Sequence, residues 1–254
     1  MATIREKLAA GKTVYGPFWK IDTPGAVEVA GYCGLDFAIF DMEHAPHSMS
    51  TVENLVRAAQ LSGLGSVVRT PDGSENAISK ALDTGAEVVL VPHVTTAEEA
   101  RQVAEASHFY PLGHRGMDIF ARAARYGAIP KNEYLSKENE HIMVAIQVEG
   151  MDAVSNLEEI LAIPGIDIVF IGPYDLSHTM GIPGEVRHPK LLETMEGIVR
   201  SIREAGKIPA THVDDVEGAG YWKSRGARFI SISVDLRILG SAFTELVSEL
   251  RNLG

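Results

Sequence analysis

Short apolar runs recur along the chain at intervals of about 20 to 35 residues, and helix-like segments separate most of them. We expect eight strands, at residues 13–19, 37–43, 66–70, 87–94, 142–149, 167–172, 208–213 and 228–235. Helical patterns fill intervening stretches such as 51–63, 74–85 and 96–107. Several of these begin with a Ser, Thr or Asp that can cap free N–H groups, and several end in Gly.

Strands that alternate with helices of this length pair in parallel through βαβ crossovers. Eight such units within 254 residues predict one (β/α)₈ barrel domain over residues 1–254. An open, doubly wound sheet is the competing arrangement. The irregular stretch 108–141 is long for a compact domain and is therefore a candidate functional loop.

The chain has 23 basic and 34 acidic residues and a net charge of −11, which argues against nucleic acid or an anionic membrane as a partner. The single cysteine, Cys33, cannot form an internal disulfide, as suits a reducing compartment. No uninterrupted apolar run is long enough to span a bilayer, and residues 1–16 look like a short amphipathic helix and not like a signal peptide. We therefore expect a cytoplasmic protein.

Polar residues follow almost every expected strand. Because the carboxyl ends of barrel strands converge on one mouth, we expect a functional cluster there. Its candidate members are Trp19, Glu43, His44, Arg69, His93, Glu149, Asp175, His212 and Asp235.

Glu149 and Asp175 follow neighbouring strands, so a barrel places them side by side. Two close carboxylates repel unless a cation or a shared proton relieves them. With no cysteine or paired imidazole nearby, a hard divalent ion such as Mg²⁺ or Mn²⁺ fits the pair. Two solvated loop acids, or a proton-sharing acid/base pair, remain alternatives.

Asp41 and Glu43 share strand parity in "FDMEHAPHS", and His44 begins the following loop. An imidazole supported by a buried carboxylate can act as a general base, although a lone histidine is more often structural. His47 is interpreted as a surface loop residue.

Arg69 lies near the end of an apolar strand and needs an anionic partner. That partner is either a structural carboxylate, Asp41 or Glu43, or a substrate oxygen that gains charge during reaction. Arg115, in "YPLGHRGMD", is interpreted as a solvated loop arginine, with guidance of an anionic substrate as the alternative.

Six blocks, in this order and spacing, resemble the HpcH/HpaI family of metal-dependent (class II) pyruvate aldolases from about residue 5 to 250. They are "DFAIFDMEHAP", "VVRTP", "VVLVP", "YPLGHRG", "IQVEGMDAVSNLEEI" and "VFIGPYDLSHTMG". The "EHAP" form is similar to the branch that acts on 2-keto-3-deoxy sugar acids. The resemblance implies reversible cleavage of a 2-keto-4-hydroxy acid into pyruvate and an aldehyde, through a pyruvate enolate that a divalent cation (Mg²⁺, Mn²⁺ or Co²⁺) stabilises.

By matching position, the resemblance implies that Glu149 and Asp175 hold the cation, that Arg69 stabilises the enolate oxygen, and that His44, oriented by Asp41, helps to move the proton of the C4 hydroxyl. Backbone N–H groups around Gly172, Pro173, Tyr174 and Asp175 would receive the pyruvate carboxylate. Trp19, His93, Gln147 and His212 complete the expected substrate-binding set. None of the eight expected strands contains the lysine that a Schiff-base aldolase needs.

The family also implies trimers or hexamers that exchange the last helix between subunits. Residues 236–254 would form that helix, with Leu239, Phe243, Leu246 and Leu250 on one apolar face.

The chain departs from the family pattern where Tyr174 replaces a small residue, His93 a Met, Gly150 a Thr, and Thr211-His212 a Gly-Leu pair. We expect these changes to make the aldehyde pocket more polar or differently shaped. Two other functions compete: the same enolate chemistry with another electrophile or leaving group (oxaloacetate decarboxylation, or condensation with an acyl thioester), and a barrel that binds a keto acid without turnover. Retention of a general base argues against the last.

Overall fold

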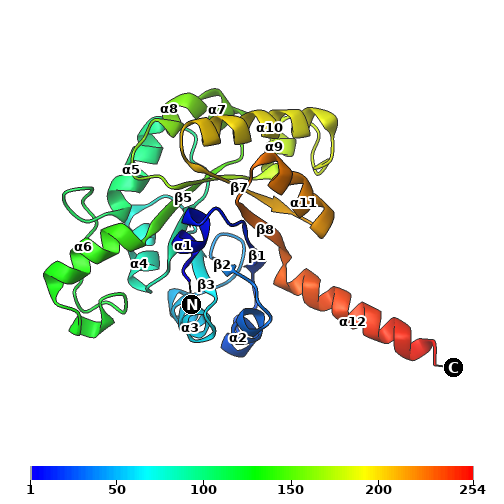
Figure 1. The fold of residues 1–254 in the computed structure, drawn as a ribbon, viewed down its shortest axis with the longest axis horizontal. Helices are drawn as coiled ribbons and strands as arrows, with labels where there is room; N and C mark the ends of the chain where they lie inside the picture. Colours follow the sequence, from blue (N-terminus) through cyan, green and yellow to red (C-terminus); the bar gives the residue numbers. More distant parts are fainter. Residues whose placement is uncertain (1, 254) are drawn as a thin grey trace.

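The structure is a computed structural model that describes residues 2–253, and its eight strands close into a parallel barrel in chain order. Figure 1 shows the helices arranged around these strands. The predicted (β/α)₈ barrel is confirmed, and the open sheet is excluded. The strands are β1 (Val14–Trp19), β2 (Phe37–Asp41), β3 (Gly65–Arg69), β4 (Val88–Val91), β5 (Met143–Val148), β6 (Ile168–Ile171), β7 (Ile208–Val213) and β8 (Phe229–Val234).

The residues expected to cap the helices do so in the structure. Ser48, Ser74 and Thr96 accept hydrogen bonds from first-turn N–H groups, and Gly63 ends α3 in the left-handed conformation. The helices are α1 (Ile4–Ala9), α2 (Pro24–Tyr32), α3 (Met49–Ser62), α4 (Glu75–Asp83), α5 (Ala97–Ser107), α6 (Lys131–His141), α7 (Met151–Ser155), α8 (Leu157–Leu161), α9 (Pro173–Thr179), α10 (Pro189–Glu204), α11 (Val216–Arg225) and α12 (Asp235–Arg251), with a 3₁₀ turn η1 (Arg125–Gly127).

Two apolar layers hold the barrel together. Inside it, the rings of Phe37 and Phe229 stack with centroids 4.0 Å apart, and Phe18 meets Phe170 edge-on at 6.0 Å. A larger layer between strands and helices includes Leu55, and it is continuous around the sheet. Because this closed scaffold is packed on both faces, side chains at its carboxyl end are held in fixed relative positions.

Strand β4 ends earlier than its apolar run suggests. The run 87–94 was expected to be a strand, but β4 stops at Val91. Pro92 has no N–H for the ladder, and His93 takes a left-handed conformation with φ of 58°. The regular strand therefore ends before His93.

The prediction that 108–141 is irregular is wrong for its last third, which forms α6. Only Tyr134 of this helix is buried, so no apolar periodicity marks it. Arg115 is neither solvated nor near the mouth. Its side chain is buried, 2.8 Å from Asp83 at the end of α4 and 3.2 Å from Glu138 on α6.

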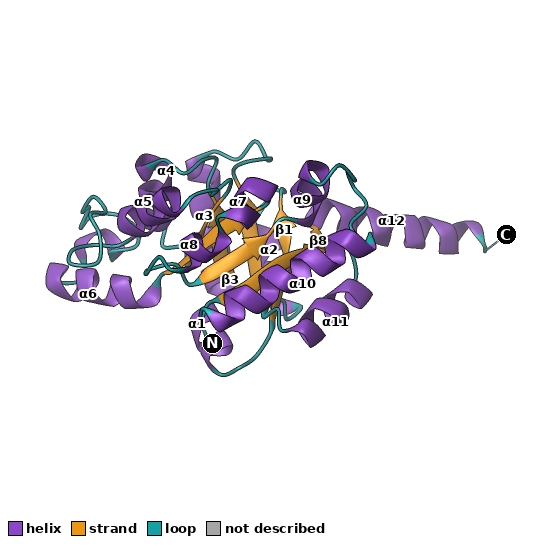
Figure 2. Ribbon diagram, turned by 90° about the horizontal axis from the view of Figure 1, so that it is seen from above, coloured by secondary structure: helices purple, strands orange, loops and turns teal. Residues whose placement is uncertain are grey.

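Helix α12 projects away from the barrel in both ribbon views (Figures 1 and 2). Its predicted apolar face is exposed, with Leu239 at 42%, Phe243 at 58%, Leu246 at 52% and Leu250 at 57%. The helix is confirmed, whereas its exchange with a neighbouring subunit stays a prediction. Residue 254 lies outside the described part of the chain. Within residues 2–253, no helix is both long and apolar enough to cross a bilayer.

Candidate active site

Arg69 joins two carboxylates at the mouth. It is aligned with Asp41 across β2 and β3. Its Nε and Nη2 donate to the two oxygens of Asp41 at 3.0 and 2.8 Å, and Nη1 lies 2.8 Å from Oε2 of Glu43. Burial raises the pKa of Asp41, but the hydrogen bonds and charge of Arg69 outweigh it and hold that pKa below its usual value. The structural partners expected for Arg69 are thus present: two of its five N–H groups donate to Asp41, and Nη1 is ion-paired with Glu43.

Asp41 fixes the loop that carries His44, but it does so through the main chain. One Asp41 oxygen accepts the N–H groups of Glu43 and His44 at 3.0 and 3.1 Å. The imidazole instead lies beside Glu43, with Nε2 3.7 Å from its carboxylate, and it is largely exposed. Asp41 was expected to contact the imidazole of His44 and orient it. In the structure, the carboxylate next to that imidazole is Glu43.

His93 connects Glu43 to Glu149. Its Nε2 lies 2.8 Å from Glu43, and its Nδ1 lies 2.7 Å from Oε1 of Glu149. The backbone N–H of His93 donates to the same oxygen at 2.9 Å. His93 therefore approaches this Glu149 oxygen with both its backbone N–H and its ring, in a backbone conformation that costs free energy outside glycine.

The other oxygen of Glu149 faces the start of α9. Oε2 accepts a hydrogen bond from Gln147. A Cβ at Gly172 would lie 3.0 Å from Oε2 and 2.9 Å from the Cβ of Glu149. Only glycine fits between the two elements without a shift. The carboxylate can therefore point toward Asp175, which follows three residues later on α9.

The electrostatics of Glu149 favour a cation. Burial raises its pKa, and repulsion from Asp175 and Glu43 adds to this, against the opposing effect of His93. The side-chain carbonyl oxygen of Gln147 is buried with no hydrogen-bond partner in the structure. Such an acceptor calls for a donor, for example a water molecule beside a bound ion. The residues present therefore fit a divalent ion.

Two free backbone donors lie beside the carboxylates. The N–H of Gly172 already donates to the carbonyl of Val148 at 3.2 Å, and Pro173 has no N–H. As residues of the first helical turn, Tyr174 and Asp175 have N–H groups without an intrahelical acceptor. The expected carboxylate-binding segment is thus reduced to these two donors.

Tyr174, in the first turn of α9, meets His212 of β7, and their rings lie 6.1 Å apart. Burial lowers the pKa of His212 to about 4, so its imidazole is neutral near pH 7. The Tyr174 hydroxyl donates to Asp214, at 3.0 and 2.8 Å from its two oxygens, and burial together with Asp214 raises the pKa of Tyr174 to about 12. Arg237, in the first turn of α12, lies 3.2 Å from Asp214.

Trp19 is placed differently from the prediction. Its indole N–H donates to the carbonyl of Ile21 at 2.8 Å, and the side chain is buried in the outer layer. Phe18 faces the interior instead, 4.5 Å below the guanidinium of Arg69 and 5.6 Å from His212. Lys20, 3.8 Å from Asp41, is a further cation that the sequence pattern did not single out. Asp235 has a structural role, accepting the N–H groups of Lys20 and Ile21.

The mouth thus combines an acidic pair that fits a hard cation, a buried arginine with donors to spare and an imidazole beside a carboxylate. Within residues 2–253, no group of three or more His, Cys, Asp or Glu side chains is arranged to hold a metal ion. An ion held by two carboxylates alone would leave positions for substrate oxygens. Together with the barrel, this set defines an enzyme that stabilises a developing oxyanion on a small carbonyl substrate.

The chain belongs to the HpcH/HpaI aldolase/citrate lyase family, whose model matches residues 15–242. It is 36% identical over 242 residues to 2-keto-3-deoxy-L-rhamnonate aldolase of Shigella sonnei (strain Ss046), a match that covers 95% of this chain and 90% of the relative. The HpcH/HpaI aldolase of Desulfitobacterium hafniense DCB-2 superposes with a TM-score of 0.93 at 30% identity and covers 100% of this chain and 98% of that one. Citrate synthase SbnG superposes with a TM-score of 0.88 at 27% identity, covering 99% and 98%.

The protein is accordingly a carbon–carbon lyase of the aldolase type, in a family that depends on divalent metal ions.

Proposed function

We propose that Glu149 and Asp175 hold the divalent cation of this aldolase, and that the other polar groups of the mouth divide the remaining work on a 2-keto-4-hydroxy acid. The observation that carries the proposal is the presentation of Glu149. One of its oxygens is held by His93, while the other faces Gly172 and the start of α9. A purely structural carboxylate would not need this arrangement.

The donor set suits Mg²⁺, Mn²⁺ or Co²⁺, since it consists of carboxylate oxygens with a buried amide oxygen nearby. When bound, the cation supplies Lewis-acid polarisation of the keto oxygen and lowers the energy of the enolate.

Arg69 stabilises the enolate oxygen. Its guanidinium is held by two hydrogen bonds to Asp41 and an ion pair with Glu43, and its other N–H groups serve the ligand. Such a pre-organised donor needs no reorganisation when charge develops on the substrate. The N–H groups of Tyr174 and Asp175 bind the substrate carboxylate, with the favourable potential of a helix start.

His44 accepts the proton of the C4 hydroxyl. As that proton passes to His44, the C3–C4 bond breaks, the aldehyde leaves, and the electrons of the bond form the enolate. C3 then takes a proton from water to give pyruvate, and His44 returns its proton to solvent. Glu43 lies beside the His44 ring and stabilises its protonated form. Asp41 holds the loop in place from the main chain.

The aldehyde half lies toward Tyr174 and His212. Both side chains are larger than the family pattern at these positions; His212 lies beside Phe18, and Tyr174 lies beside His212. Kinetics with a panel of aldehydes tests this placement in Tyr174→Ala and His212→Leu. Unchanged aldehyde preference in both variants would refute it.

Related enolate chemistry is the second candidate function. The likeness to citrate synthase SbnG favours it, because a citrate synthase joins its substrates by carbon–carbon bond formation. Oxaloacetate decarboxylation and condensation with an acyl thioester use the same enolate, so they need the same residues.

The exposed apolar face of α12 supports an oligomer in which this helix packs on a neighbouring subunit, in a trimer or hexamer. Size-exclusion chromatography with light scattering, on the full chain and after Phe243→Asp, measures this assembly. The single, exposed Cys33 is consistent with a cytoplasmic location.

Pyruvate release from a 2-keto-4-hydroxy acid, followed with a coupled lactate dehydrogenase assay, tests the function. We expect release with added Mg²⁺ or Mn²⁺, loss with EDTA, and loss in Glu149→Gln with the fold retained. Oxaloacetate and acetyl thioesters are assayed in parallel. Faster turnover of either would assign the second candidate function.

A further inference from the structure

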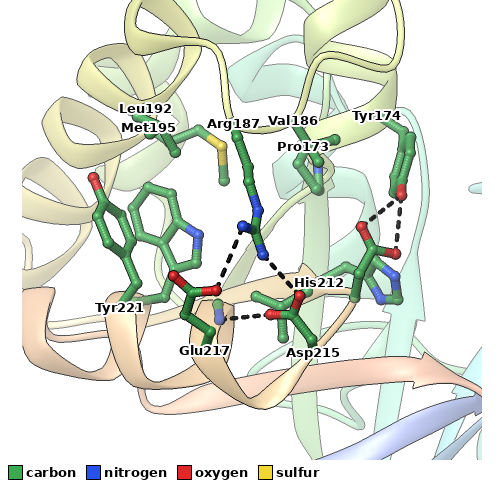
Figure 3. A pocket seen from close by; sticks show the side chains of 14 residues that line it. Pro173, Tyr174, Val186, Arg187, Leu192, Met195, His212, Asp215, Glu217 and Tyr221 are labelled. Atoms are coloured by element: carbon green, nitrogen blue, oxygen red, sulfur yellow. Dashed lines mark hydrogen bonds and ion pairs between the residues drawn. The ribbon is translucent and has the colours of Figure 1, made fainter.

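A cavity of about 260 Å³ lies next to the mouth, and Tyr174 and His212 line it (Figure 3). Its interior is apolar and is formed where α9, β7, α10 and α11 meet. The side chains concerned are Pro173, Val186, Leu192, Met195, Val213 and Trp222.

The cavity crosses the carboxyl end of β7. Along this strand, Ala210 belongs to the core inside the barrel and Val213 to the layer outside it. Because side chains alternate, His212 has the parity of Ala210 and faces the interior. A cavity lined by both His212 and Val213 therefore reaches from the mouth into the space beneath α10 and α11.

A row of four side chains lies between the reacting end of the site and this cavity. The guanidinium carbon of Arg69 lies 4.5 Å from the Phe18 ring, which is 5.6 Å from His212, which is 6.1 Å from Tyr174. Tyr174 and His212 belong both to this row and to the lining of the cavity, so they separate the cavity from the reacting end of the site.

The charged groups at the rim are paired with one another. Arg187 lies 2.7 Å from Asp215 and 3.5 Å from Glu217, as Figure 3 shows. Asp214 accepts the Tyr174 hydroxyl and lies 3.2 Å from Arg237. His212, with its pKa lowered to about 4 by burial, is neutral. A charged ligand would find no unpaired partner, so the chemistry favours an apolar one.

We propose that this cavity binds the apolar end of the acceptor aldehyde, so that the enzyme acts on 2-keto-4-hydroxy acids whose chain beyond C4 ends in an alkyl group or a ring. The proposal rests on the aldolase function above. An apolar cavity of about 150 Å³ accommodates benzene, so this one has room for a ring or for a chain of about six carbons.

Direct binding is measured first, with no turnover. Trp222 lines the cavity and is only 5% exposed, and Trp19 is the other tryptophan of the chain. We expect hexan-1-ol to change the tryptophan fluorescence saturably, and the change to disappear in Trp222→Phe. Glycerol is the polar control and should have no effect.

Aldol addition to pyruvate then tests whether the cavity serves the reaction. The native oligomer is assayed with straight-chain aldehydes from acetaldehyde to hexanal, and with glyceraldehyde. We expect kcat/KM to rise about threefold to fourfold for each added methylene group, the effect of burying it. Leu192→Trp, which fills the cavity from α10, should abolish this rise, whereas Glu193→Trp on the exposed side of the same helix should retain it.

Exchange of the pyruvate methyl hydrogens with deuterated water separates this proposal from the aldolase function, because exchange needs no aldehyde. We expect exchange to be unchanged in Leu192→Trp. If exchange occurs but chain length has no effect on kcat/KM, or the effect persists in Leu192→Trp, the acceptor subsite is refuted while the aldolase function stands. If hexan-1-ol does not bind, the cavity is not an apolar ligand site at all.

Discussion

Replacing His93 with glycine removes the imidazole between Glu43 and Glu149 and leaves the left-handed backbone intact. The variant keeps the N–H bond to Glu149, since glycine adopts a φ of 58° without strain. It loses the contacts of 2.8 and 2.7 Å to the two carboxylates. Oε1 of Glu149 is then held by this N–H alone, and the pKa of Glu149 rises further because the His93 imidazole no longer lowers it.

We expect the affinity for Mn²⁺ to fall about tenfold. Partners that orient a metal-binding side chain typically contribute about 10- to 100-fold to affinity. The lower end applies because the His93 side chain is 64% exposed, so solvent screens its charge. Removing an unfavourable backbone conformation offsets the added flexibility of glycine, so the unfolding temperature should stay within about 2 °C of the wild type.

Titration of the metal-free protein with Mn²⁺, followed by the electron paramagnetic resonance of free Mn²⁺, measures this affinity. His93→Asn is the matched variant, because Asn tolerates the left-handed region and restores one donor. It should recover part of the affinity. Tighter Mn²⁺ binding in His93→Gly would refute the reasoning, because it would mean that the imidazole competes with the ion.

Three further changes give distinct results. Gly172→Ala should abolish Mn²⁺ binding in calorimetry, because its Cβ meets Glu149 at 2.9 Å, whereas Gly150→Ala, with its nearest atom at 3.9 Å, should bind normally. Arg69→Ala leaves Asp41 with only the more distant Lys20 and Glu43 without its arginine, so denaturant unfolding should show a loss of about 3 kcal/mol, and equal stability would contradict this pairing. The depressed pKa of His212 means that the unfolded chain takes up a proton first as pH falls. Stability present above about pH 6.5 should therefore decline by about 3 kcal/mol toward pH 4, and His212→Leu should remove that part of the decline.

The barrel could be predicted from the sequence because the patterns that mark its strands and its helices are both clear. Fully apolar runs mark strands that are buried on both faces, and caps mark the helices between them. Helix α6 escaped notice because it buries a single residue and so has no apolar stripe. Strand β4 was overextended because hydropathy does not register the missing N–H of Pro92 or the turn at His93.

Most residues of the candidate site could be identified from the sequence, but the contacts between them could not. Strand ends identified Arg69 and Glu149, since a barrel brings such ends together. Which of two successive residues faces the interior depends on register, and the pairing of β1 with β8 shifts between Gly16 and Phe18. That is why Phe18, and not Trp19, reaches the mouth.

The link from Glu43 through His93 to Glu149 was not predictable in detail, because it depends on one backbone angle. No local sequence pattern predicts that a histidine adopts the left-handed backbone conformation. The pairing of Arg115 with Glu138 escaped for a similar reason, since the two residues are brought together only by the packing of α6.

The central claim is that this mouth generates a pyruvate enolate with a divalent ion held by Glu149 and Asp175. Proton NMR of pyruvate in deuterated water tests it most directly, because loss of the methyl signal reports the enolate whatever the electrophile. We predict rapid exchange with Mg²⁺ or Co²⁺, none with EDTA, and none in Glu149→Gln or Asp175→Asn. Exchange that is unaffected by EDTA, or its absence with every divalent ion, would contradict the account.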